Sequence, residues 1–252
     1  MKLDKQQILN RVLGVMLLTA TVGVPMSSIA APTSPANPMT LGKTAITQKQ
    51  YAKALQIYEA AAKTDQYKNS CECRLGLGKS LCLVAKTQKG TEQTTTYKRA
   101  VKELRTAIRL GRGSVNAKEA NVVMLSLPKN ILAPKTGADT PMIALAHGFR
   151  GMDRGGEAAK PKVIEFTAKW CDPCQQLKPI MAKAKADYAD QVEFITVDID
   201  DPKSEKIIED YEVSPIPTLI FLDSSNQVIT YSVGYSGENG LKAGIKKIVP
   251  HS

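Results

Sequence analysis

Histidine, aromatic residues and long apolar runs are scarce in this chain of 252 residues, and each shortage excludes a class of function. The two histidines, His147 and His251, lie in a glycine-rich stretch and in the tail, and we interpret both as ordinary surface residues. A metal site built on a pair of cysteines needs further ligands, and the chain around its Cys-x-x-Cys pair offers none. Aromatic residues are 5% of the chain and form no stacking array, so we exclude nucleic acid as a partner.

The apolar run near the start of the chain, Val12 to Val24, is too short to span a bilayer comfortably. Basic residues precede it and the small residues of 28–30 follow it, so residues 1–30 have the pattern of a bacterial signal peptide, with cleavage predicted after Ala30. The rest of the chain is then expected in the periplasm or another extracytoplasmic compartment. An uncleaved N-terminal membrane anchor is the alternative. Residues 31–39 are rich in proline and predict a spacer.

Residues 40–127 have the apolar spacing of helices and contain one internal repeat. Five positions recur after a shift of 46 residues: Tyr51, Ala54, Leu55, Tyr58 and Ala61 as Tyr97, Ala100, Val101, Leu104 and Ala107. The pattern resembles tetratricopeptide repeats, which implies a groove for a protein partner. Because the family period is shorter, we expect a loop around residues 87–95, and a third helix over residues 116–127 as a cap. A helical hairpin packed only for its own core is the alternative.

Residues 170–174 read Trp-Cys-Asp-Pro-Cys and lie where an apolar strand, residues 163–167, should turn into a helix that begins near Pro173. A cysteine at a helix N-terminus faces free N–H groups and the positive end of the helix dipole, which favour the nucleophilic thiolate. Cys174 lies one turn beyond Cys171, within reach for a disulfide. The spacing predicts thiol–disulfide exchange, in which one sulfur attacks and the other resolves. Half of a zinc site, or two buried structural cysteines, are the alternatives.

Apolar, β-branched and turn-forming stretches continue a regular pattern after the cysteine pair. They predict a strand over 192–198, a helix over 202–211, a strand over 219–222, its hairpin partner over 228–233 and a last helix over 238–249. This β-α-β-α-β-β-α order, with the cysteines after the first strand, resembles the thioredoxin family over residues 160–252. The resemblance implies an α/β thioredoxin-like fold, a mixed central sheet flanked by helices, preceded by the all-α tetratricopeptide-like module.

The resemblance also implies a role for individual residues. Cys171 falls at the attacking cysteine, Cys174 at the resolving one, and Glu165 at a buried acid that carries the resolving thiol's proton. The groove that binds protein substrates is implied to comprise Trp170, Pro173, Ile216, Pro217 and Thr218. Within it, the tryptophan covers the disulfide, and Pro217 falls at the family's cis-proline. No cofactor is needed, since the Cys171–Cys174 pair is itself the redox group.

Three departures from the family pattern matter. The family usually has Asp at the position of Glu165, and its partner lysine is replaced by Thr196, which leaves the proton route open. Asp172 stands where the family usually has glycine. A carboxylate beside Cys171 opposes thiolate formation, so we expect the pair to act as a reductant. Its expected partners are protein thiols and disulfides, and a membrane or soluble electron donor.

Two alternatives stay open. The chain could be a tetratricopeptide-type scaffold or adaptor of the cell envelope with an auxiliary redox domain. It could also be a dedicated reductant for cytochrome c maturation, although the residues Pro217-Thr218 favour a general thioredoxin.

Cys71, Cys73 and Cys82 are interpreted as small buried residues of the helical module, with a disulfide between two of them as the alternative. Residues 128–159, rich in proline and glycine, predict a linker. Charge changes along the chain: residues 31–159 carry 20 Lys and Arg against 9 Asp and Glu, whereas residues 160–252 carry 11 against 14. We interpret the basic excess as a solvated surface. A site for acidic partners or anionic lipids is the alternative.

Overall fold

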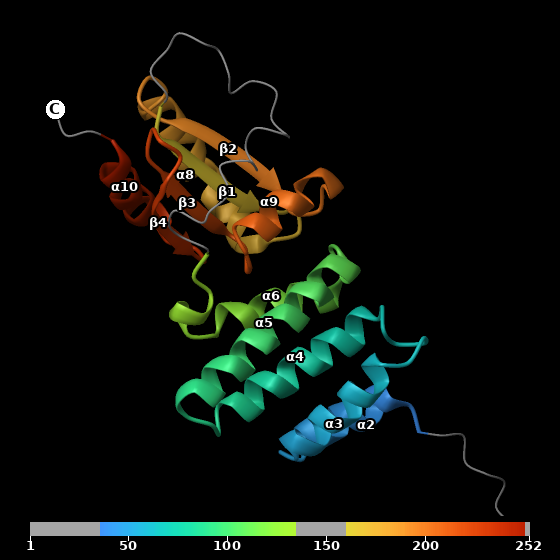
Figure 1. The fold of residues 1–252 in the computed structure, drawn as a ribbon. Helices are drawn as coiled ribbons and strands as arrows, with labels where there is room; N and C mark the ends of the chain where they lie inside the picture. Colours follow the sequence, from blue (N-terminus) through green and yellow to red (C-terminus); the bar gives the residue numbers. More distant parts are fainter. Residues whose placement is uncertain (1–35, 135–159, 250–252) are drawn as a thin grey trace, which may run out of the picture. The chain divides into compact units, whose positions relative to one another are not determined.

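The computed structural model describes residues 36–134 and 160–249 (Figure 1). We refer to the first range as the helical segment and to the second as the C-terminal segment. The predicted signal peptide, both histidines and most of the predicted linker lie outside these ranges. Within the two described ranges, no helix combines the length and the apolar character needed to cross a membrane.

Every regular element of the helical segment is a helix, α-helical except for one short 3-10 helix, so the predicted all-α region is confirmed. Its elements are α2 (Pro38–Thr47), α3 (Tyr51–Ala62), α4 (Cys71–Ala85), α5 (Gly90–Gly111), α6 (Val115–Leu125) and η1 (Lys129–Ile131). Helix α2 begins at Pro38, inside the predicted spacer, because proline is favoured in a first helical turn and Asn37 caps it by accepting a hydrogen bond from Met39 N.

The loop predicted over residues 87–95 is wrong, because α5 begins at Gly90 and runs for 22 residues. The positive φ of Gly90, 62°, lets the chain turn sharply after α4, so the connection is short. Thr94 and Thr95 then donate their hydroxyls to carbonyls one turn earlier in the helix. The composition of this stretch indicates a loop, but the amphipathic sequence that follows packs against the core and extends the helix back to Gly90, and the threonine hydroxyls find partners inside it.

Two equivalent positions of the internal repeat pack in the same way against α4. A methyl group placed on Gly76 would lie 2.3 Å from the ring of Tyr58, and one placed on Gly78 would lie 2.6 Å from Leu104 Cγ. Tyr58 also packs against Gly42 of α2, where an added methyl group would lie 2.4 Å from the Tyr58 ring. The glycines therefore let α2 and α4 approach the buried ring of Tyr58 from two sides, and α5 approach α4 beside it.

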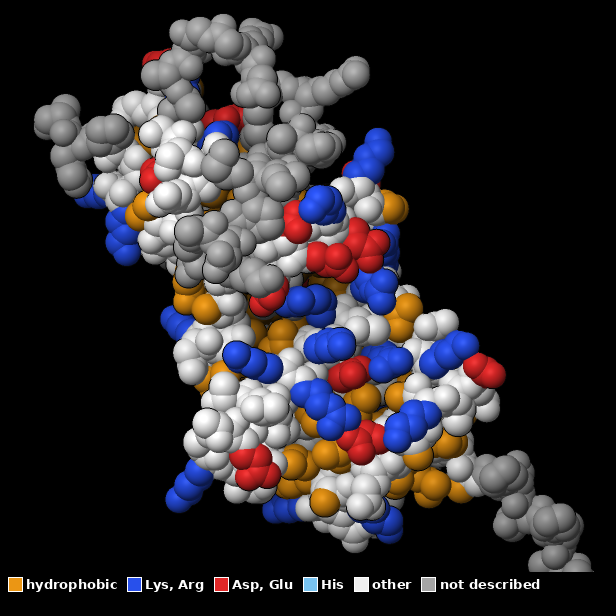
Figure 2. Space-filling model, in the orientation of Figure 1, with side chains coloured by type: hydrophobic (Ala, Val, Ile, Leu, Met, Phe, Trp, Pro, Cys, Tyr) orange, Lys and Arg blue, Asp and Glu red, His pale blue; other side chains and the backbone are white. Residues whose placement is uncertain are grey.

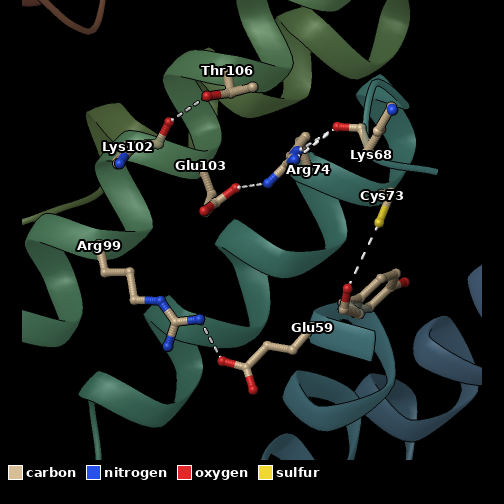
Figure 3. Close-up of polar contacts among 9 residues, drawn as sticks. Glu59, Lys68, Cys73, Arg74, Arg99, Lys102, Glu103 and Thr106 are labelled. Carbon is tan, nitrogen blue, oxygen red and sulfur yellow. Dashed lines mark hydrogen bonds and ion pairs between the residues drawn. The ribbon is translucent and has the colours of Figure 1, made fainter. Parts of the chain in front are cut away.

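Polar contacts connect the helices around this core, as Figure 3 shows. Arg74 of α4 pairs with Glu103 of α5 at 2.8 Å and also donates to the carbonyl of Lys68 in the preceding turn. Arg99 of α5 pairs with Glu59 of α3. Lys and Arg side chains are spread over the face of the helical segment seen in Figure 2, with acidic side chains between them, a distribution that favours the solvated-surface interpretation.

The C-terminal segment has the predicted order of strands and helices. Its elements are β1 (Lys162–Thr167), α8 (Asp172–Asp187), β2 (Glu193–Asp198), η2 (Pro202–Ser204), α9 (Glu205–Asp210), β3 (Thr218–Leu222), β4 (Val228–Val233) and α10 (Gly237–Ile248). They form one mixed sheet in the order β2-β1-β3-β4. Strand β1 pairs in parallel with β2 and antiparallel with β3, and β3 pairs antiparallel with β4.

Alternate residues of β1 separate two hydrophobic clusters, one on each face of the sheet. Val163 points into a cluster with residues of α8 and α10, including Leu177 and Leu241. Ile164 and Phe166 point to the other face, into a cluster with α9 that also contains both cysteines of the pair. All six residues of β1 are buried, so this strand anchors the turn that leads to the cysteines.

We predict that Gly76→Ala lowers the free energy of unfolding, because its methyl group would overlap the ring of Tyr58. Overpacking of this kind costs about 1–3 kcal/mol, against about 1 kcal/mol gained from replacing glycine within a helix. Chemical denaturation monitored by circular dichroism measures the difference. The matched test is the same substitution in a Tyr58→Leu background, where the penalty should disappear. An equal penalty in both backgrounds would contradict the packing explanation.

Candidate redox site

A disulfide joins Cys171 and Cys174 at the point where the chain leaves β1 and enters α8. Cys171 is the N-cap of α8, and its sulfur accepts a hydrogen bond from Cys174 N at 3.3 Å. Pro173 fits the first turn of the helix because it needs no hydrogen-bond partner for its nitrogen. A thiolate formed at Cys171 on reduction would therefore face an N–H group and the positive end of the dipole of a 16-residue helix.

The disulfide is buried, and the loop before β3 is part of the same hydrophobic cluster. Cys171 is 2% exposed and Cys174 fully buried, and Ile216 lies in their cluster. The Ile216–Pro217 peptide bond is cis. Thr218 is buried, and its hydroxyl donates to the carbonyl of Pro215 at 2.6 Å. The structure thus brings the cysteines and the predicted groove residue Ile216 together, and it buries Pro217 in the same loop and Thr218 at the start of β3.

Trp170 is held by a carboxylate that sequence reasoning missed. Its indole nitrogen donates to Asp200 Oδ2 at 2.7 Å. Burial raises the pKa of Asp200, while the hydrogen bond from Trp170 acts in the opposite direction. Because β1 and β2 are parallel, the residues that follow their carboxyl ends lie at one edge of the sheet. That register, which places Thr167 beside Asp198, is the signal that could have identified Asp200.

Glu165 is 4% exposed and lies on the face of the sheet that α8 covers. It accepts a hydrogen bond from the hydroxyl of Thr196 at 3.4 Å, and that hydroxyl accepts one from Lys185 Nζ of α8 at 3.2 Å. Burial raises the pKa of Glu165, and Lys185, Thr196 and Lys178 oppose the rise. Thr196 stands on β2 where the family pattern has a lysine, and Lys185 reaches it from α8. Lys178 and Lys185 lie seven residues apart, two turns along one helix, so the sequence already indicated that both side chains share one face of α8.

Two kinds of link are absent from the described residues. No hydrogen bond there joins Glu165 to Cys174, whose sulfur is held in the disulfide. Nor does any group of three or more His, Cys, Asp or Glu side chains in residues 36–134 and 160–249 come together in a way that could hold a metal ion. Cys71, Cys73 and Cys82 carry no disulfide.

Comparisons with known proteins agree with this geometry. The thioredoxin family model matches residues 156–247. Thioredoxin H4 of Arabidopsis thaliana is 33% identical over 101 residues, which cover 40% of this chain and 79% of that protein. The chain therefore belongs to the thioredoxin family, and the thioredoxin fold expected for the C-terminal segment is confirmed.

Two other relatives are similar over a smaller share of their length. The thiol:disulfide interchange protein TxlA of Synechococcus elongatus is 32% identical over 90 residues, which cover 36% of this chain and 47% of TxlA. The chloroplastic thioredoxin-like protein HCF164 of Oryza sativa subsp. japonica is 39% identical over 64 residues, which cover 25% of this chain and 24% of HCF164. The chain thus spans about half of TxlA and about a quarter of HCF164.

We predict that Glu165 makes the protein less stable as the pH rises. Its pKa in the folded state lies above that of an unfolded chain, so its contribution is fully present below about pH 4 and is lost as the pH rises through the folded-state pKa. In Glu165→Gln this dependence should disappear, so the variant gains stability relative to the wild type between pH 4 and pH 7. Denaturation midpoints measured across that range give the difference.

The companion variant is Thr196→Val, which removes a hydrogen bond that favours the ionised carboxylate. It should make the loss of stability with rising pH steeper, the opposite of the effect of Glu165→Gln. Parallel pH profiles for the wild type and both variants would show that Glu165 is not the titrating group.

Proposed function

We propose that this protein is a thiol–disulfide oxidoreductase that acts on protein cysteines through Cys171 and Cys174, as a reductant. The observation that carries the proposal is the position of Cys171 as the N-cap of α8, with Cys174 N directed at its sulfur and the second sulfur one turn away. The likeness to TxlA, a thiol:disulfide interchange protein, supports the same chemistry.

The reaction proceeds in two exchanges. In the reduced protein the Cys171 thiolate attacks a disulfide of the client, forms a mixed disulfide, and releases one client sulfur as a thiolate. The Cys174 thiol then loses its proton and attacks the sulfur of Cys171. The second client sulfur leaves, and the Cys171–Cys174 disulfide forms. The client has gained two electrons, and a donor must return two electrons to the protein before the next cycle.

Glu165 is proposed to accept the proton of Cys174 in the second exchange. Burial raises the pKa of Glu165, so its carboxyl takes up a proton more readily than an exposed carboxyl does, which is what this step requires. The route from Glu165 through Thr196 to Lys185 provides a polar path from the buried acid to an exposed side chain. Asp172, exposed beside Cys171, supports the reducing direction because its charge disfavours the thiolate and so favours the disulfide.

The helical segment is proposed to be a tetratricopeptide-like module that binds a client or a partner protein. The repeat supports this, since Tyr58 and Leu104, 46 residues apart, both pack against glycines of α4. The signal-like start of the sequence supports export, and an extracytoplasmic site of action would require an electron donor outside the reducing cytoplasm.

The decisive test compares two cysteine variants in the reduction of insulin by dithiothreitol. Cys171→Ser should lower turnover to the uncatalysed rate, because no nucleophile remains. Cys174→Ser should also stop turnover. When this variant is reduced, freed of dithiothreitol and mixed with insulin, it should accumulate one mixed disulfide per chain, visible by mass spectrometry. The matched control is Cys71→Ser, which removes a thiol of the helical segment and should retain wild-type turnover. Equal, negligible turnover in the wild type and in Cys171→Ser would instead favour a scaffold.

A further inference from the structure

The side chain of Asn121 in α6 forms a double hydrogen bond with the main chain of Ile216. Its Nδ2 donates to the Ile216 carbonyl at 2.9 Å, and Ile216 N donates to Asn121 Oδ1 at 2.9 Å. Asn121 is 4% exposed, and Ile216 is 2% exposed in the same cluster as the disulfide. One side-chain amide thus satisfies both main-chain groups of a residue beside the redox pair.

This pairing reproduces the way two polypeptide strands recognise each other. A side-chain amide carries the same acceptor and donor as a peptide group. Ile216 precedes a proline, which disfavours helical backbone and favours an extended one. In an antiparallel ladder, an extended residue exchanges both of its main-chain hydrogen bonds with one partner residue. An extended client peptide that added to the edge of this loop would need the same N–H and C=O of Ile216.

Further contacts place α6 and the turn before it along the site. Met124, one turn after Asn121, accepts a hydrogen bond from the hydroxyl of Ser214 at 3.0 Å. In the turn before α6, Gly113 lies beside Trp170, where an added methyl group would be 3.5 Å from the indole Cδ1. Helix α6 and the turn before it therefore contact both loops beside the disulfide: the turn contacts the loop with Trp170, and the helix contacts the loop with Ile216.

A cavity adjoins the pair, so the amide is not enclosed on every side. Its volume is about 290 Å³, and its lining includes Asn121, Ile216 and Pro215 together with Arg105 and Arg109 of α5. A peptide entering there would approach Ile216 directly, and the amide could be displaced without unfolding α6.

We propose that Asn121 is a specificity-determining residue that competes with client polypeptides for the main-chain groups of Ile216. The inference rests on the proposed thiol–disulfide exchange. While the amide is in place, disulfides in extended peptides are disfavoured, because they must displace it to align with Cys171. A client that supplies its own contacts to replace the amide is favoured. Small disulfides without a peptide group should react with Cys171 at the same rate whether or not the Asn121 amide is present.

The test uses the full chain with Cys174→Ser, so that each attack stops at the first exchange. One substrate is a short peptide whose single cysteine is joined in a disulfide to thionitrobenzoate, and the other is Ellman's reagent, which has no peptide group. In both, the Cys171 thiolate forms a disulfide with one sulfur and thionitrobenzoate leaves as a coloured thiolate. Rates measured for the variant that also carries Cys171→Ser are subtracted, because Cys71, Cys73 and Cys82 are free thiols.

Asn121→Ala should raise the second-order rate constant for the peptide on the order of tenfold, because the peptide no longer has to displace two hydrogen bonds. The rate constant for Ellman's reagent should change by less than about twofold. Asn121→Asp keeps the size of the side chain but cannot donate to the Ile216 carbonyl, so it should also raise the peptide rate selectively. Asn116→Ala, on the same helix, is the matched control and should change neither rate. Circular dichroism verifies that each variant is folded.

Other outcomes would overturn the inference in distinguishable ways. Equal acceleration with both reagents would mean that α6 only restricts access to the sulfur. A slower reaction with the peptide would mean that Asn121 positions the loop for its client. If neither reagent releases thionitrobenzoate in a manner that depends on Cys171, in the presence or absence of the Asn121 substitutions, the proposed function itself fails.

Discussion

The structure depends most on the contact between a sulfur and a helix N-terminus. Strand β1 is buried on both faces, and its end fixes where α8 can begin. Cys171 becomes the cap of that helix because the chain turns there, and Pro173 starts the helix with a preset backbone angle. The hydrogen-bonding group that stabilises the helix start is thus the same atom that would carry out the chemistry. Any change that moves α8 along β1 would disturb folding and reactivity together.

Around this contact, polar groups at the edge of the sheet are arranged in two sets. Trp170 and Asp200 follow the two parallel strands and hold each other across the carboxyl edge. Glu165, within β1, is reached from α8 through Thr196. Trp170, in the first set, lies beside Gly113 of the helical segment, whereas the second set lies under α8 and connects the buried Glu165 to the exposed Lys185.

The order of elements in the C-terminal segment could be read from the sequence, because buried strands and amphipathic helices repeat their apolar residues with different periods. The cysteine pair was found from its own motif, whereas the cis peptide before Pro217 and the buried position of Glu165 were implied only by the resemblance to the thioredoxin family. The start of α5 at Gly90 could not be predicted from this periodicity. A stretch rich in threonine has the composition of a loop, although here the threonine hydroxyls form hydrogen bonds within the helix. The pairing of Asn121 with Ile216 joins residues 95 positions apart and leaves no periodic signal.

The three remaining cysteines, all in the helical segment, differ from Cys171 in how readily their thiols ionise. Burial raises the pKa of Cys73 and of Cys82 to about 11. At neutral pH only about one such thiol in 10⁴ is ionised, and only the ionised form can enter an exchange. Cys71, half-buried, donates its hydrogen to the Ala107 carbonyl at 3.1 Å. Burial therefore suppresses thiol–disulfide exchange at Cys73 and Cys82, because so little of either thiol is in the reactive form at neutral pH.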